Sequence, residues 1–257
     1  NYTFIFDGCE IGSAEESSNW LPAIRNGAWH PDSRIRIFLS NKTVMGAKGG
    51  DAGNISGYFE TTNNNPPVTV TNPKDGTDCF DSNGIETEIY LNYTAHGYTA
   101  DSSLFAAGGG GGSAIGLGGT FSTSAIAAAS GGGGSGIPSG NAGLINLQIQ
   151  APEFYLVDSK PGYDGLFDSG GQAFSAEAAG GFGTGKASAT DGGASEPSLT
   201  PTASGFKSYA STGALNSFAI KGALAPTDIK VYNLASESNK FKPGRSVAGV
   251  DFTLIDS

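Results

Sequence analysis

Alternation between apolar and polar residues is the clearest pattern along this chain, and it predicts β-strands. The segment RIRIFLS, residues 34–40, places charged and apolar side chains on opposite faces. In the segment GIETEIYLNYT, every second residue forms one face: Ile85, Thr87, Ile89 and Leu91. Shorter runs predict strands at residues 1–6, 66–72, 144–149, 217–224, 227–235 and 247–257. A short helix is favoured only within residues 13–27, where Ser13 provides an N-cap and Pro22 ends the helix.

Glycine sets the character of the rest of the chain. The sequence holds 41 glycines in 257 residues, whereas about 7% is usual. We therefore predict a mainly β fold, with antiparallel strands, glycine-rich loops of polyglycine II type and little helix. Composition divides the chain into a strand scaffold with a first glycine motif, a glycine-rich region with inserted loops, and C-terminal strands, at residues 1–107, 108–204 and 205–257. A single domain over the whole length is the other interpretation.

Several glycines recur at intervals of three residues, which is the period of the polyproline II helix. That helix has no internal hydrogen bonds, so its N–H and C=O groups can pair with neighbouring segments where no Cβ intervenes. The glycines on such registers are Gly46, Gly49, Gly110, Gly116, Gly119, Gly131, Gly134, Gly140 and Gly143. The pattern predicts an ordered glycine scaffold, while a flexible linker and irregular loops remain the alternatives.

Charge argues against several classes of partner. The formal net charge is -10, and only 15% of residues are charged. Nucleic-acid binding needs a clustered basic patch, and anionic membranes attract basic segments, so we expect neither partner. The apolar runs are only a few residues long, and we expect no membrane insertion. For Cys9 and Cys79 we favour two buried thiols over one disulfide bridge.

The sequence offers no readable catalytic motif. Residues 180–188, GGFGTGKAS, nearly fit a phosphate-binding loop, but Ala187 replaces the Ser or Thr that holds magnesium. The acidic segment 75–88 departs from the EF-hand ligand pattern, and we interpret Asn83-Gly84 as a hairpin turn. His30 and His96 lie outside any catalytic or metal-binding motif. We therefore expect no enzyme activity, no cofactor and no metal.

Two segments resemble a known viral family. Residues 21–54, LPAIRNGAWHPDSRIRIFLSNKTVMGAKGGDAGN, resemble a phage tail unit in which a Pro-Ala-Ile segment leads through a strand and a turn into polyglycine. Residues 85–143, with ETEIYLNYT and LFAAGGGGGSA, resemble a second such unit more loosely. These units occur in central tail-fibre or host-specificity proteins of lambda-like phages and in glycine-rich adhesins of T-even-like phages. The chain departs from the family at Lys42-Thr43, where Asn-Gly is expected, and in its few, broken glycine blocks.

The resemblance implies a receptor-binding protein at the tail tip of a virion. Its partners would be a bacterial outer-membrane protein or surface polysaccharide, together with other tail-tip proteins. Central fibres are usually homotrimers, whereas the T-even-like adhesins act as single chains, so both states stay open. A structural or ice-binding glycine-lattice protein is the first alternative function. A polysaccharide-degrading tailspike, with Asp158, Asp164 and Asp168 as its candidate carboxylates, is the second.

Aromatic residues near the glycine blocks are the candidate recognition residues, because tyrosine gives a large contact area at low entropy cost. The alternative is that they pack on the glycine scaffold as core. The candidate receptor-binding residues are Tyr58, Phe59, Tyr98, Phe105, Phe154, Tyr155, Tyr163 and Phe167. The candidate recognition loops are residues 61–76 and 153–165.

Overall fold

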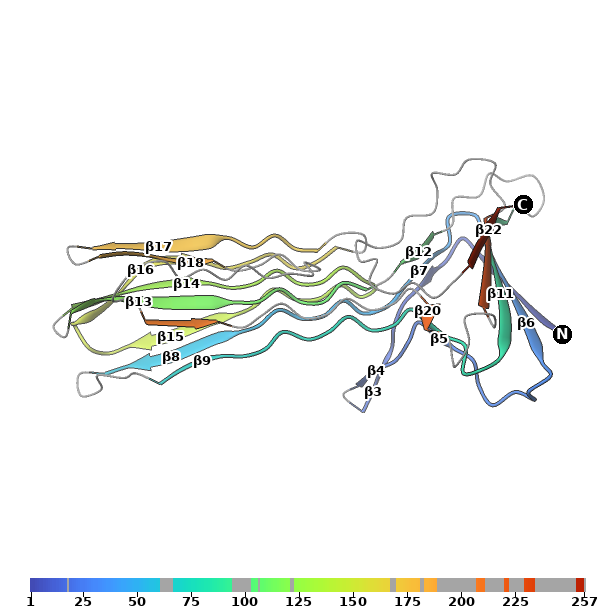
Figure 1. Cartoon of the computed structure of the whole chain (residues 1–257), viewed down its shortest axis with the longest axis horizontal. Helices are drawn as coiled ribbons and strands as arrows, with labels where there is room; N and C mark the ends of the chain where they lie inside the picture. Colours follow the sequence, from blue (N-terminus) through green and yellow to red (C-terminus); the bar gives the residue numbers. More distant parts are fainter. Residues whose placement is uncertain are drawn as a thin grey trace.

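The computed structural model shows an elongated, mainly β molecule in which long runs of chain lie side by side and connect two ends (Figure 1). It describes residues 1–17, 19–60, 67–93, 103–105, 107–120, 123–166, 170–180, 183–188, 207–210, 220–221, 229–233 and 253–256. No helix occurs in this part of the chain, and hence none that could span a bilayer. We call the end that holds the N-terminus the base and the opposite end the tip.

The base is built around a five-stranded parallel sheet. Its strands, in spatial order, are β1 (Tyr2–Asp7), β6 (Arg34–Ser40), β11 (Glu86–Tyr93), β21 (Ile229–Asn233) and β22 (Thr253–Asp256). The predicted alternation in β6 and β11 is confirmed, because one face of these strands is buried and the other bears ion pairs. On that second face, Arg36 Nε lies 2.8 Å from Glu88 Oε2.

Short strands complete the base. One three-stranded sheet contains β5 (Ile24–Arg25), β10 (Phe80–Asp81) and β20 (Ile220–Lys221). A second three-stranded sheet contains β2 (Glu10–Ile11), β7 (Val44–Gly46) and β12 (Ser103–Phe105). A hairpin pairs β3 (Glu15–Glu16) with β4 (Asn19–Trp20). The first hydrophobic core lies among these sheets and includes Ile37, Leu39, Met45, Phe80 and Ile89.

The tip contains three sheets and a second core. The first sheet orders β16 (Phe154–Lys160), β14 (Thr123–Ala129), β13 (Ala114–Thr120) and β19 (Lys207–Ala210). The second orders β15 (Ile145–Ile149), β8 (Ile55–Phe59) and β9 (Val68–Val70), and the third pairs β17 (Ser175–Gly180) with β18 (Gly183–Ser188). Ile55, Phe59, Ile115 and Ile126 are fully buried in the second core.

Glycine-rich segments join the two ends and form what we call the shaft. Its described segments are residues 47–54, 71–78, 107–113, 130–143, 161–166 and 170–174. Backbone hydrogen bonds tie these segments to one another, and two bonds, from Gly140 N to Gly134 O and from Gly143 N to Gly131 O, join the two halves of residues 130–143. Gly50 N donates to Gly108 O at 2.8 Å, and Gly134 N donates to Gly50 O at 2.8 Å. The shaft therefore satisfies its backbone groups through neighbouring segments, without conventional sheets.

The prediction of antiparallel strands is wrong for most of the described pairs. The pairs β1–β6, β6–β11, β11–β21, β8–β15 and β14–β16 are all parallel. At the tip, the reason lies in the path of the chain, which runs out along the shaft, turns and returns. Strands reached on two outward runs, such as β8 and β15, point the same way, as do strands on two return runs.

Three local expectations are also corrected. The helix expected within residues 13–27 is replaced by β3, β4 and β5. The aromatic loop expected after β15 contains a strand, β16, paired with β14. Asn83-Gly84 forms a turn closed by Ile85 N donating to Ser82 O at 3.1 Å, with positive φ at both central residues. That turn connects β10 and β11, which belong to different sheets, so it closes no hairpin.

Strand pairing crosses the divisions that composition indicated at residues 107 and 204. β8, from the first segment, pairs with β15, from the second. From the third segment, β19 pairs with β13 at the tip, while β20 and β21 pair with β10 and β11 at the base. Cys9 and Cys79 are not joined by a disulfide.

Candidate functional site

The structure separates the predicted recognition residues into four places. Tyr58 and Phe59 lie in β8, Phe154 and Tyr155 lie in β16, and Tyr163 lies on the shaft. Phe105 lies in β12 at the base, and its side chain is outside the described part of the structure. Tyr98 and Phe167 fall outside the described residues, as does part of the predicted loop 61–76.

Phe59 is a core residue, which corrects its assignment to an exposed recognition surface. Its side chain is fully buried, and its ring centroid lies 5.2 Å from that of the half-buried Phe154. The two rings link the sheet of β8 to the sheet of β16. Packing of aromatics against the scaffold, which was the alternative interpretation, therefore describes this pair.

Tyr155 and Tyr163 are exposed, but they do not form one surface with Tyr58. Tyr155 begins an exposed run on β16 that continues through Leu156 and Val157. Tyr163 follows β16 on the shaft, where its ring meets Phe174 edge-on at 5.5 Å. The predicted loop 153–165 is thus divided between a strand and a shaft segment.

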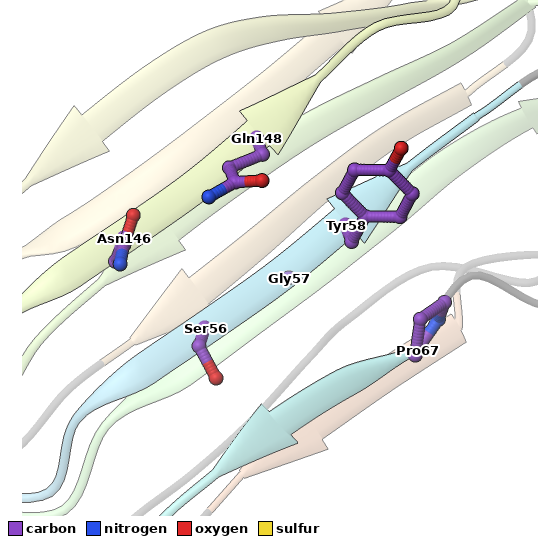
Figure 2. Close-up of a pocket in the computed structure, with 6 residues that line it drawn as sticks. All are labelled: Ser56, Gly57, Tyr58, Pro67, Asn146 and Gln148. Atoms are coloured by element: carbon purple, nitrogen blue, oxygen red, sulfur yellow. The ribbon is translucent and has the colours of Figure 1, made fainter.

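An open groove lies on the outer face of the sheet formed by β15, β8 and β9 (Figure 2). Its volume is about 250 Å³, and it is lined by Ser56, Gly57, Tyr58, Pro67, Asn146 and Gln148. We call it the β8 groove. It combines one of the predicted aromatic residues with polar side chains from two neighbouring strands.

Parallel pairing in register brings the lining residues together. Asn146 is the partner of Ser56, and Gln148 is the partner of Tyr58. Because side chains alternate along each strand, these four point outward while the intervening Leu147 packs against the core. A Cβ on Gly57 would lie 2.8 Å from the Phe59 ring, so this glycine leaves space for the buried ring below the groove.

The β8 groove is lined entirely by uncharged residues. Tyr58 Oη donates a hydrogen bond to Gln150 Oε1 at 2.9 Å, which fixes the outer edge of the ring. Within the described residues, the exposed amides of Asn146 and Gln148 make no side-chain hydrogen bond, so they are available to a ligand. The groove can bind a polar, uncharged molecule, but its residues offer no nucleophile–base pair and no carboxylate.

A charged cluster lies on the shaft. Asp51 Oδ1 accepts from Lys48 Nζ at 2.8 Å and from the backbone and side-chain nitrogens of Asn141 at 3.0 Å. Burial by itself raises the pKa of Asp51, but the Asn141 N–H and the ammonium groups of Lys48 and Lys74 outweigh it and lower that pKa. Each partner belongs to the shaft, so the cluster joins its segments.

Sequence reasoning missed Ser56, Asn146 and Gln148, whereas Pro67 lies in the predicted recognition loop 61–76. A signal for two of them was present, because INLQI in β15 alternates aliphatic residues with Asn146 and Gln148. An amide pair on the exposed face of a strand is common, and only the pairing with β8 places it beside Tyr58.

No family model, curated protein or solved structure matches the chain. The described residues contain no cluster of side chains suited to a metal ion.

Proposed function

We propose that this protein is a receptor-binding adhesin at the tail tip of a phage virion. The observation that carries the proposal is its shape. The glycine-rich shaft holds a compact tip, with the β8 groove, far from the base that contains the N-terminus (Figure 1). The resemblance of residues 21–54 to phage tail units supports the same conclusion. Binding is non-catalytic and needs no cofactor.

We further propose that the shaft is a polyglycine II-type lattice. Gly131 and Gly134, and Gly140 and Gly143, are spaced by three residues. At each of these four positions, an added Cβ would overlap a backbone carbonyl of an adjacent segment. Chains can approach this closely only where hydrogen replaces the side chain. The lattice gives the adhesin a thin, stiff stalk with almost no bulky side chains.

We assign a different class of partner to each end of the molecule. The tip meets a bacterial outer-membrane protein or surface polysaccharide, and the base attaches to other tail-tip proteins. The edge strand β1 exposes Tyr2, Phe4 and Ile5 at the base. Such exposed apolar groups are typical of interaction surfaces. Single-chain and homotrimeric assemblies are both compatible with this arrangement.

Binding of the labelled full chain to a panel of Gram-negative strains tests the proposal. We expect saturable binding to some strains, displaced by excess unlabelled chain, and slower infection of those strains by phages that share the receptor. Heat-unfolded chain is the control for non-specific adhesion. Binding of the folded chain no stronger than that of the unfolded control on every strain contradicts the adhesin proposal.

The uncharged outer face of β15, β8 and β9 favours one alternative, an ice-binding glycine-lattice protein. Ser56, Thr69 and Asn146 are aligned across this face and exposed. Thermal hysteresis of the purified chain tests this function directly. Hysteresis without binding to any cell would replace the adhesin with the ice-binding alternative, whereas cell binding without hysteresis would exclude ice binding.

A further inference from the structure

We propose that the β8 groove binds one uncharged sugar unit of a bacterial surface glycan. This inference rests on the proposed adhesin function and names the chemistry of its receptor. It also assigns a direct role in binding to Tyr58, Asn146 and Gln148, with Ser56 as a further polar contact.

The size and openness of the groove fit a single ring of a longer chain. Its volume of about 250 Å³ lies below the range of roughly 300–1,000 Å³ that holds drug-sized ligands. The groove lies on the outer face of a sheet rather than inside the tip (Figure 2). A sugar unit of a polysaccharide can therefore enter the groove from its open side.

The hydrogen-bonding groups of the groove match sugar hydroxyls. Each amide of Asn146 and Gln148 offers two N–H donors and a carbonyl acceptor, and the Ser56 hydroxyl both donates and accepts. A sugar hydroxyl also donates and accepts, so either orientation of the amides finds a partner. Parallel pairing in register places Asn146 beside Ser56 and Gln148 beside Tyr58, which groups these side chains on one face.

The Tyr58 ring provides the apolar part of the site. It is half-buried, and its hydroxyl is held by Gln150 Oε1 at 2.9 Å, so little side-chain entropy is lost on binding. The face of an aromatic ring carries negative potential. It therefore attracts the weakly positive C–H groups on the apolar face of a pyranose. In Figure 2 the ring and the amide of Gln148 lie on adjacent strands at one end of the groove.

The absence of charge in the lining favours a neutral sugar over an acidic one. Recognition of a carboxylate or phosphate usually uses Arg or Lys, and none lines the groove. A protein partner is less well served, because protein interfaces rely on apolar anchors in desolvated pockets over a much larger area. The exposed apolar run of the tip, Tyr155 to Val157, lies on β16 in another sheet.

The variants Asn146→Ala and Gln148→Ala test the site, alone and combined. Both residues are exposed, so their loss should leave folding intact. Asn19→Ala removes an exposed amide from β4 at the base and is the matched control. Tyr58→Phe keeps the ring but loses the bond to Gln150, whereas Tyr58→Leu removes the ring. Circular dichroism and the melting temperature confirm the fold of each variant.

The probes are arrays of neutral hexose oligosaccharides, acidic oligosaccharides and outer-membrane proteins in vesicles, read with labelled full chain. We expect binding to one or more neutral glycans, weakened at least tenfold by the Asn146→Ala/Gln148→Ala double variant and by Tyr58→Leu. Tyr58→Phe should bind more tightly than Tyr58→Leu, and Asn19→Ala should bind like the wild type. The same variants are then compared on whole cells.

The outcomes separate this inference from the adhesin proposal. Cell binding that groove variants leave unchanged overturns the inference and leaves the adhesin intact. Binding only to acidic glycans, or only to outer-membrane proteins, also overturns it. Binding to neutral glycans through the groove, without binding to any cell, contradicts both the adhesin and a bacterial surface glycan as the ligand of the groove. No binding to any neutral glycan overturns the inference.

Discussion

At the scale of single residues, glycine acts through the side chain that it lacks. Gly134 lies in the shaft with its Cα against the backbone of Gly108, and its N–H donates to Gly50 O. Six of the nine glycines predicted from period-three spacing make such backbone approaches: Gly49, Gly110, Gly131, Gly134, Gly140 and Gly143. Gly46 instead meets the side chain of Ile137, and Gly116 and Gly119 lie in strand β13.

The substitution Gly134→Ala should destabilise the protein. The methyl group of the alanine would overlap the Gly108 carbonyl. The segments that contain Gly134 and Gly108 are both held by backbone hydrogen bonds, so neither can move away without breaking some of them. Overpacking costs about 1–3 kcal/mol, and each kcal/mol lowers the Tm of a chain this long by about 2–4 °C. Scanning calorimetry measures the change. Gly27→Ala is the control, because the nearest heavy atom there is Trp29 Nε1 at 3.9 Å. Equal melting of both variants would contradict close packing at Gly134.

At the scale of elements, a few polar side chains fix segments that have almost no side chains. Asp51 bonds to Asn141 and Lys48, and Lys74 Nζ lies 3.6 Å from its second oxygen. Lys48 is buried, donates to Gly49 O at 2.6 Å, and lies 5.6 Å from the Trp20 ring. The cluster therefore holds three shaft segments in one register and connects them to β4.

The lowered pKa of Asp51 predicts a loss of stability in acid. Its carboxylate stabilises the folded state fully above the unfolded value of 3.8. This contribution decreases as the pH falls below that value and disappears below the folded pKa. Asp51→Asn should therefore melt below the wild type at about pH 7, and the difference should narrow towards about pH 2.

Thermal melting of both proteins across this pH range measures the effect. Asp32→Asn is the matched control, because its side chain is 91% exposed and its ion pair is with the exposed His30 at 3.5 Å. It should melt like the wild type at neutral pH. A constant difference between the wild type and Asp51→Asn down to about pH 2 would show that the carboxylate charge contributes nothing.

At the scale of the whole molecule, two hydrophobic cores lie at opposite ends of a shaft made mainly of small residues. The base core includes Ile37 and Phe80, and the tip core includes Phe59 and Ile126. Repeated outward and return runs connect the two cores, so each one is assembled from distant parts of the sequence. Both cores therefore combine strands that are separated in the sequence by shaft segments.

This shape predicts an unusually large radius of gyration. A compact chain of 257 residues would have a radius of gyration of about 18 Å. We expect small-angle X-ray scattering to give a clearly larger value and an asymmetric pair-distance distribution. Data taken at several concentrations, with the mass from forward scattering, separate an elongated monomer from an oligomer. A monomer near 18 Å would contradict the extended arrangement.

The sequence by itself determined much of the local structure. Alternation located β6, β11 and β15, because a strand with one buried face must place apolar residues at every second position. Glycine spacing indicated six of the close backbone approaches, since a missing Cβ is a property of the residue itself, but it did not indicate others such as those at Gly50, Gly133 and Gly162. Local patterns misjudged residues 13–27 and β16, where pairing with other segments overrides the helix and loop preferences of the sequence.

Only the tertiary structure decided which strands pair and in which direction. At the tip, the direction of pairing depends on how many times the chain has travelled along the shaft, which no local pattern records. The same pairing buries Phe59 and places Asn146 and Gln148 beside Ser56 and Tyr58 to form the β8 groove. The paired residues of the groove are about 90 positions apart in the chain, so the sequence showed that these polar residues exist but not that they lie side by side.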